Sequence, residues 1–209
     1  MPTILTFGDS NTHGTPPMTD RVLRARHGRD IRWPQVMARE LGWDLVEEGL
    51  PGRTTQFDDP VMDGLMNGFP ALRQALQSHG PLDVLTLMLG TNDVKTRFGA
   101  TPAQVMAGMA ALLDLATGLE MQDRHGGFRV LLICPPPVLE TGVLAMDFWG
   151  ARAKSQALPP LYAALAASRG VGFLDAGEVI AVSPVDGVHF DAAAHLALGA
   201  AVAEAVRGL

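Results

Sequence analysis

Residues 3–10 read TILTFGDS, an apolar run that ends in a glycine, an acid and a serine. The run Thr3–Phe7 has the length and composition of a buried strand, and Gly8 permits a tight turn directly after it. Ser10 then stands at the end of that strand and is a candidate nucleophile. A serine hydroxyl attacks a carbonyl carbon only when a base takes its proton and donors hold the oxygen that becomes negative. The rest of the chain must therefore supply a base and donors.

Further apolar runs alternate with helical patterns along the chain, which is typical of βαβ units and a parallel sheet. The predicted strands are Thr3–Phe7, Asp44–Glu48, Val84–Leu89, Arg129–Cys134 and Val171–Asp175, of which the middle three are expected to be covered on both faces. The predicted helices are Pro34–Leu41, Ala71–His79, Pro102–Leu119, Ala151–Arg169 with a bend near Pro159-Pro160, and Ala192–Arg207. The pattern predicts the α/β class: a flavodoxin-like three-layer α/β/α sandwich around a five-stranded parallel sheet of order 2-1-3-4-5. Its length suits a single domain over residues 1–209.

The composition limits the class of partner. The chain has 209 residues, a formal charge of −6 and 47% hydrophobic residues. No basic cluster is present in the sequence to neutralise a phosphate backbone, so we expect no nucleic-acid partner, and the negative charge disfavours anionic membrane surfaces. No apolar run reaches the length of a membrane span. Because the first residues do not resemble a signal peptide and Cys134 is the single cysteine, we expect a cytoplasmic protein.

The groups that Ser10 needs follow other predicted strands. Gly52, after the second strand, can let its backbone N–H approach a ligand, and Asn92, after the third, supplies an amide donor. Asp186 and His189 precede the last helix, where a carboxylate can orient an imidazole. Taken alone, each segment is typical of a turn or a helix cap. Because the carboxyl ends of parallel strands meet at one edge of a sheet, we expect all four at the edge that carries Ser10.

These blocks, in this order, resemble the GDSL, or SGNH, hydrolase superfamily over essentially the full chain. More narrowly, the chain is similar to the bacterial arylesterase and acyltransferase branch in five segments: EEGL (47–50), RTT (53–55), DDP (58–60), MLGTND (88–93) and DGVHF (186–190). The resemblance implies an esterase that hydrolyses small short-acyl aryl or alkyl esters, with acyl transfer to alcohols or peroxide as a further outcome. It implies a small-molecule ester as ligand, no cofactor, no metal, and a homo-oligomer.

Carried over position by position, the resemblance makes Ser10 the nucleophile, His189 the base and Asp186 the residue that orients the base in a catalytic triad. The backbone N–H groups of Ser10 and Gly52 and the side-chain amide of Asn92 would form the oxyanion hole. Two alternatives stay open. The same machinery suits a carbohydrate O-deacetylase or an acyl thioesterase, and the fold alone also suits a non-catalytic flavodoxin-like module that binds an anion.

The pocket is predicted from its loops. Two long connections, Thr15–Arg32 and Pro135–Gly150, are expected to wall it, because loops of this length in a compact domain are usually functional. The candidate lining residues are Asn11, His13, Trp33, Phe148 and Trp149. For the three aromatic residues, a place in a subunit interface or in the packed core is the alternative. Asn11 and His13 depart from the residues that the family often has beside the serine, so they bear on substrate preference. We expect His13 in the pocket wall rather than as a competing base.

Two other features have structural interpretations. The adjacent acids Asp58 and Asp59, which precede Pro60, are expected in a solvated turn rather than at a metal. Cys134 ends an apolar run and is expected to be a buried structural thiol.

Overall fold

The computed structural model describes residues 1–22 and 25–209. Its strands are β1 (Thr3–Gly8), β2 (Asp44–Gly49), β3 (Val84–Met88), β4 (Arg129–Cys134) and β5 (Gly172–Asp175). They form one sheet of order β2-β1-β3-β4-β5 in which all neighbours are parallel. The predicted α/β/α sandwich and strand order are confirmed. At the carboxyl end of β1, Gly8 pairs with Gly49 on one side and Met88 on the other.

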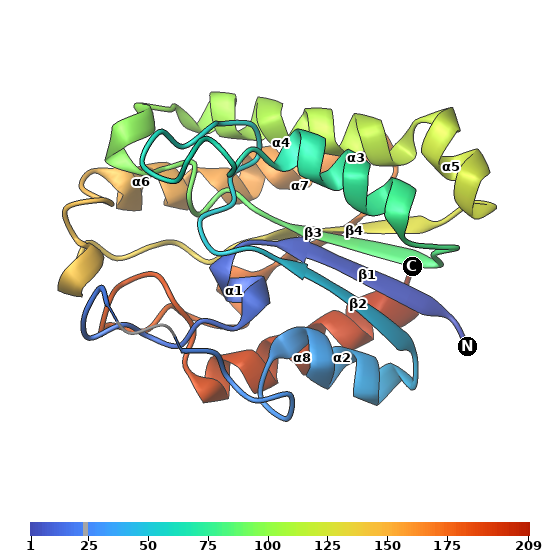
Figure 1. The fold of residues 1–209 in the computed structure, drawn as a ribbon, viewed down its shortest axis with the longest axis horizontal. Helices are drawn as coiled ribbons and strands as arrows, with labels where there is room; N and C mark the ends of the chain where they lie inside the picture. The colour runs from blue at the N-terminus through green and yellow to red at the C-terminus, as the bar shows by residue number, and fades with distance from the viewer. Residues whose placement is uncertain (23–24) are drawn as a thin grey trace.

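Helices cover both faces of the sheet (Figure 1). The α-helices are α1 (Ser10–His13), α2 (Trp33–Leu41), α3 (Gly68–Ser78), α4 (Pro102–Thr117), α5 (Leu119–His125), α6 (Ala151–Gln156), α7 (Leu158–Arg169) and α8 (Ala192–Arg207), and the 3₁₀ turns are η1 (Thr96–Phe98), η2 (Gly142–Leu144) and η3 (Ala176–Glu178). Figure 1 shows α2 and α8 on one face and α3, α4 and α7 on the other. Both chain ends lie at the amino end of the strands, so α1 and the loops that follow the strands lie at the opposite edge.

The two faces bury separate cores. One core lies between the sheet and α3, α4 and α7 and includes Leu87 and Leu112, and the other lies between the sheet and α2 and α8 and includes Met37 and Leu198. Cys134 is fully buried at the end of β4, as predicted. Because burial of these apolar residues fixes the sheet on both faces, the carboxyl edge provides a rigid base for its loops.

One prediction about burial is wrong. β2 was expected to be covered on both faces, but its residues are only partly buried, whereas every residue of β1 beyond Thr3 is buried. The strand order explains this difference, because it places β2 at an edge of the sheet although it is second in the sequence. The charged half of β2 is accommodated by ion pairs, including Glu47 with Arg32 at 2.8 Å.

Two predicted helices are each divided in the structure. α4 ends at Thr117 because Gly118 is extended (φ −65°, ψ 148°), and α5 then begins. The helix predicted over Ala151–Arg169 breaks at Ala157, and its two prolines lie in the first turn of α7, where no backbone N–H is lost to the helix. In the described part of the chain no single helix is long and apolar enough to cross a membrane; α4 and α5 meet that test only together, across a 47° bend.

Candidate active site

Ser10 lies directly beyond β1, as the first residue of the one-turn helix α1. The carboxylate of Asp9 caps this helix by accepting the N–H of Asn11 at 2.9 Å. A Cβ atom at Gly8 would lie 2.0 Å from Oγ1 of Thr12, so only glycine lets α1 fold back so closely on the end of the strand. The turn therefore holds the Ser10 side chain at the carboxyl edge of the sheet.

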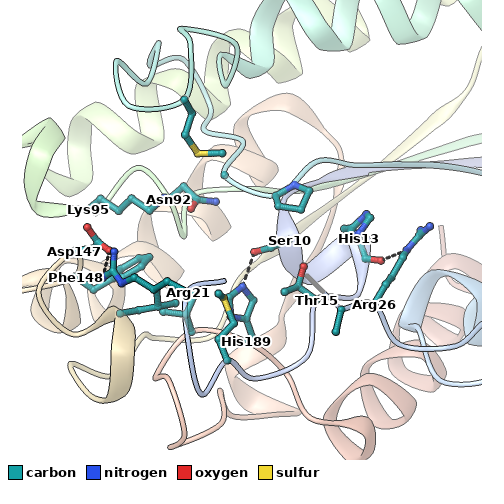
Figure 2. A pocket seen from close by; sticks show the side chains of 17 residues that line it. Ser10, His13, Thr15, Arg21, Arg26, Asn92, Lys95, Asp147, Phe148 and His189 are labelled. Atoms are coloured by element: carbon teal, nitrogen blue, oxygen red, sulfur yellow. Dashed lines mark hydrogen bonds and ion pairs between the residues drawn. The ribbon is translucent and has the colours of Figure 1, made fainter. Parts of the chain in front are cut away.

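Ser10, His189 and Asp186 form a continuous series of hydrogen bonds. Oγ of Ser10 lies 3.1 Å from Nε2 of His189, and Nδ1 of His189 lies 2.6 Å from Oδ2 of Asp186. Figure 2 shows Ser10 and His189 facing each other across one side of the cavity. All three side chains are almost fully buried, so solvent competes little with these bonds.

Asp186 is held in its charged form. Burial opposes the charge, but hydrogen bonds from the ring and backbone of His189 and from the N–H of Met18 outweigh burial and lower the pKa of Asp186 to about 2. An ionised Asp186 accepts a proton donor, so Nδ1 of His189 carries the hydrogen and Nε2 presents its lone pair. Nε2 can then accept the Ser10 hydroxyl proton.

The turn that carries Asp186 and His189 is braced by its own backbone. The N–H of Ser183 donates to the carbonyl of His189 at 2.8 Å, and the N–H of Gly187 donates to the carbonyl of Ser183 at 2.9 Å. Directly after this turn, Asp191 caps α8 by accepting the N–H of Ala194 at 2.8 Å. The imidazole is therefore supported by a closed turn on one side and a helix start on the other.

Three candidate hydrogen-bond donors belong to residues that line the same cavity: the backbone N–H groups of Ser10 and Gly52 and the side-chain amide of Asn92. Among the described residues, neither backbone N–H has an acceptor. Gly52 adopts φ 94°, and a Cβ there would lie 2.7 Å from Sδ of Met62, so this position requires glycine. This set of donors can stabilise a negatively charged oxygen.

Asn92 connects the loops after β1, β2 and β3. Its Nδ2 donates to the backbone carbonyl of Arg53 at 3.0 Å and to Oδ2 of Asp9 at 3.3 Å. The next residue, Asp93, accepts the N–H of Thr55 at 2.9 Å and its hydroxyl at 2.5 Å. These bonds fix the loop of Gly52 against the end of β3.

Sequence reasoning did not identify Asp9 and Asp93 as site residues. Both are buried, and burial raises the pKa of each to about 6. The available signal was their position, because each acid stands directly beside a predicted site residue at the end of a strand, Asp9 before Ser10 and Asp93 after Asn92.

A cavity of about 420 Å³ opens beside Ser10 and His189. The two long loops wall it, as expected: Met18, Arg21 and Arg26 come from the first, and Leu144, Asp147 and Phe148 come from the second. Residues 23–24 of the first loop, which were also predicted to wall the pocket, lie outside the described residues. The lining is mainly apolar around a few polar groups, which is the usual character of a small-molecule site.

The predicted lining residues divide into two groups. His13 and Phe148 line the cavity. Asn11, Trp33 and Trp149 do not, which corrects their prediction as pocket residues. In α1 each residue is turned about 100° from the last, so Asn11 points away from Ser10 and donates to the carbonyl of Val188 at 3.1 Å. 

The two tryptophans lie elsewhere for different reasons. Trp33 is fully buried in the core beneath α2 and α8, where its Nε1 donates to the carbonyl of Asn11 at 3.1 Å. Trp149 is 65% exposed on the surface. Neither residue therefore lines the cavity beside Ser10.

The acidic pair also differs from its prediction. Asp58 is exposed, but Asp59 is fully buried and pairs with Arg97 at 3.1 Å, so it is not part of a solvated turn. Within the described residues no three His, Cys, Asp or Glu side chains form a group that could hold a metal ion.

A hydroxyl, an imidazole and a carboxylate lie in hydrogen-bonded series at the carboxyl edge of a parallel sheet. Beside them are the Asn92 amide and two backbone N–H groups that have no acceptor among the described residues. This is the arrangement of hydrolases that act on acyl groups. The model of the GDSL-like lipase/acylhydrolase family matches residues 6–197, and the chain belongs to this family. No curated protein matches the chain significantly.

Several solved structures are similar to this protein over its whole chain. An aryl esterase from M. smegmatis in an inhibitor-bound form is 39% identical, with a TM-score of 0.94 and coverage of 100% of both chains. A carbohydrate acetylesterase from Sinorhizobium meliloti is 37% identical, with a TM-score of 0.94 and coverage of 100% of this chain and 99% of the other. A putative arylesterase from Agrobacterium tumefaciens is 39% identical, with a TM-score of 0.88 and the same two coverages.

Proposed function

We propose that this protein is a serine esterase that hydrolyses small short-acyl esters through an acyl-enzyme. The observation that carries the proposal is the series from Ser10 through His189 to Asp186, with distances of 3.1 and 2.6 Å, at the wall of a cavity of about 420 Å³. The aryl esterase and carbohydrate acetylesterase named above, at 39% and 37% identity, support an ester as the substrate.

In the first half of the reaction, Nε2 of His189 takes the Ser10 hydroxyl proton while Oγ attacks the ester carbonyl carbon. The carbonyl oxygen becomes negative and is held by the N–H groups of Ser10 and Gly52 and by the Asn92 amide, each donor lowering the barrier by about 3 kcal/mol. The bond from Asn92 to Asp9 is long at 3.3 Å, so an oxyanion can replace it at small cost. The tetrahedral intermediate collapses, His189 gives its proton to the departing alkoxide, and the acyl group stays on Ser10.

In the second half, His189 takes a proton from water, whose oxygen attacks the acyl-Ser10 carbonyl. The intermediate expels Oγ, which recovers its proton from His189, and a carboxylic acid leaves. An alcohol or peroxide in place of water would give acyl transfer by the same steps. Throughout both halves Asp186 keeps its charge and stabilises the imidazolium, because its pKa of about 2 lies far below neutral pH.

The cavity volume favours small substrates. About 420 Å³ is close to the lower end of the range for small-molecule sites, which supports a short acyl group and a compact alcohol. Carbohydrate O-deacetylation is the second candidate, favoured by the 37% identical acetylesterase from Sinorhizobium meliloti. Both candidates use the same steps at Ser10 and differ only in the alcohol that leaves.

The test combines a variant with a substrate panel. We expect Ser10→Ala to lower kcat for p-nitrophenyl acetate by about 10⁴-fold or more, because no nucleophile remains. A serine-directed fluorophosphonate should add its mass once to the wild type and not to the variant. Ser168→Ala is the matched control, because the hydrogen bonds of its Oγ stay within α7: Oγ donates to the carbonyl of Leu165 at 2.7 Å and accepts from Arg169 at 3.2 Å. Full activity of Ser10→Ala, or an unlabelled wild type, would overturn the proposal.

The panel then separates substrate classes. It holds p-nitrophenyl esters of increasing acyl length, an acetylated sugar and acetyl-CoA. We expect kcat/KM to be highest for acetyl esters and to fall as the acyl chain lengthens. A preference for the sugar would select the second candidate, and a preference for acetyl-CoA would make the protein a thioesterase.

A further inference from the structure

Lys95 is an almost buried cation of the cavity wall that pairs with no acid among the described residues. Its side chain lines the cavity beside Asn92, and only 8% of the residue is exposed. Among the described residues, Nζ has no carboxylate within 4.0 Å and no hydrogen-bond acceptor. Figure 2 places Lys95 with Asn92 and Phe148 on the side of the cavity away from His13. Its three N–H donors are therefore available to a molecule in the cavity.

The other basic residues of the cavity wall differ from Lys95. Arg21 pairs with Asp147 at 2.6 Å, and Arg26 lies 3.5 Å from Glu47 and donates to the carbonyl of His13 at 2.7 Å. Among the described residues, Lys95 instead makes a cation–π contact with the face of Phe148, with Nζ 5.8 Å from the ring centroid. A cation–π contact near the limit of its range is weak beside the cost of taking an ammonium out of water.

Carboxylates lie near Lys95, but none of those described pairs with it. Burial lowers the pKa of Lys95, and Arg97 lowers it further, while Asp59, Asp147 and Asp9 act in the opposite direction. The first two of these carboxylates are already engaged, because Arg97 pairs with both, at 3.1 Å to Asp59 and 3.0 Å to Asp147. A negative group brought in by a ligand would find the ammonium unpaired.

The backbone links this cation to the reacting centre. The N–H of Lys95 donates to the carbonyl of Asn92 at 3.2 Å, so both residues belong to one turn after β3. A ligand whose carbonyl oxygen accepts a hydrogen bond from the Asn92 amide would therefore lie beside the turn that also carries Lys95. Small-molecule sites set their specificity with few polar groups in a largely apolar wall, and Lys95 has this position here.

We propose that Lys95 is a specificity-determining residue that binds an anionic group of the substrate, in the simplest case a carboxylate. The inference rests on the proposed function, because it assumes that the cavity holds an ester whose carbonyl lies at Ser10. The preferred substrates are then small esters that carry a negative charge on either the acyl or the alcohol part.

Two substrate pairs locate the charge. The first compares 4-acetoxybenzoate with phenyl acetate and places a carboxylate on the leaving group. The second compares ethyl hydrogen succinate with ethyl pentanoate and places it on the acyl group. The readout is the ratio of kcat/KM for the charged ester to that for the neutral ester, measured in a pH-stat at pH 7.5.

We expect this ratio to fall about tenfold or more in Lys95→Met for at least one pair, mostly through KM, because a charge-assisted hydrogen bond is lost. Lys95→Arg keeps the charge and should keep the ratio within about threefold. Lys154→Met, at the other lysine of the chain, is the matched control and should leave both ratios unchanged. Ratios in Lys95→Met that equal the wild-type ratios for both pairs would overturn the proposal.

A binding measurement separates this proposal from the esterase mechanism. Calorimetry on Ser10→Ala compares benzoate with benzamide, its neutral counterpart, with and without Lys95→Met. We expect Lys95→Met to weaken benzoate at least tenfold and to change benzamide far less. Equal weakening of both ligands counts against anion recognition. If Lys95→Met selectively loses benzoate binding while the wild type hydrolyses no ester, the anion site is supported and the proposed function is rejected.

Discussion

Ser10 lies between two buried carboxylates that have opposite protonation behaviour. Asp9 precedes Ser10 in the chain, and Asp186 reaches it through His189; the two acids are 1% and 0% exposed. Burial raises the pKa of a carboxyl group, yet the pKa is about 6 for Asp9 and about 2 for Asp186. Burial alone therefore does not decide which acid is charged.

The difference comes from hydrogen-bond donors. Asp186 accepts the N–H groups of Met18, Val188 and His189 and the ring Nδ1–H of His189, at 2.6 to 3.0 Å. Asp9 accepts the N–H of Asn11 at 2.9 Å and the amide of Asn92 at 3.3 Å. Asp186 is therefore surrounded by donors, while Asp9, which borders the proposed oxyanion hole, has fewer donors and holds the Asn92 amide weakly. The comparison predicts that the two acids respond differently to the same substitution.

The largest effect is expected at Asp186. In Asp186→Asn the amide cannot hold the Nδ1–H tautomer of His189, so kcat for p-nitrophenyl acetate should fall about 10⁴-fold. The measurement is steady-state kinetics at pH 7.5, with circular dichroism to confirm folding. Asp191→Asn is the matched control, because Asp191 only caps α8 and asparagine caps equally well. Loss of less than tenfold in Asp186→Asn would show that the carboxylate does not orient the base.

Much of the site could be predicted because its signals are local. The serine turn after an apolar run, the glycine and asparagine after later strands and the Asp-Gly-x-His segment each stand at a strand end or a helix start. The parallel order β2-β1-β3-β4-β5 then brings these segments to one edge. Alternation of apolar runs and helical patterns predicts the parallel sheet, since such a sheet depends on βαβ connections.

The rest could not be predicted because it depends on distant contacts. One donor to Asp186 is the N–H of Met18, 168 residues away, and no sequence pattern indicates that bond. The partial exposure of β2, by contrast, could have been predicted, because the predicted strand order already placed this strand at an edge of the sheet. The side on which Asn11 lies follows from the helical turn of α1, whose four residues are too few to show a periodic pattern.

A smaller effect is expected on the other side of Ser10. Asn92→Ala removes one donor of the proposed oxyanion hole, and kcat should fall about 10²–10³-fold with little change in KM, because the oxygen is fully negative only in the transition state. Asn67→Ala is the control, since its side chain only caps α3 by accepting the N–H of Phe69 at 3.0 Å. An increase in KM at constant kcat would instead assign Asn92 to ground-state binding.

The smallest effect concerns the stability of the fold against pH. Asp186 has a folded-state pKa of about 2 against 3.8 for an ordinary aspartate, so its stabilisation, about 2 kcal/mol, is complete above pH 4 and is lost as the pH falls through about 2. Asp9 has a raised pKa of about 6, so it favours the folded state below pH 4 and costs about 3 kcal/mol as the pH rises through 6.

Urea denaturation at stepped pH measures both effects as differences in unfolding free energy, wild type minus variant. For Asp9→Asn the difference should decrease between pH 4 and 6. In this window the Asp9 carboxyl ionises in the unfolded wild type but stays protonated in the folded wild type, where it is buried with few donors. For Asp186→Asn it should increase between pH 2 and 4, because only the folded wild type gains a charge that hydrogen-bond donors surround. Asp58→Asn, at an exposed acid, should give a flat difference in both windows. Curves of the same sign for Asp9 and Asp186 would mean that donor number does not set their charge.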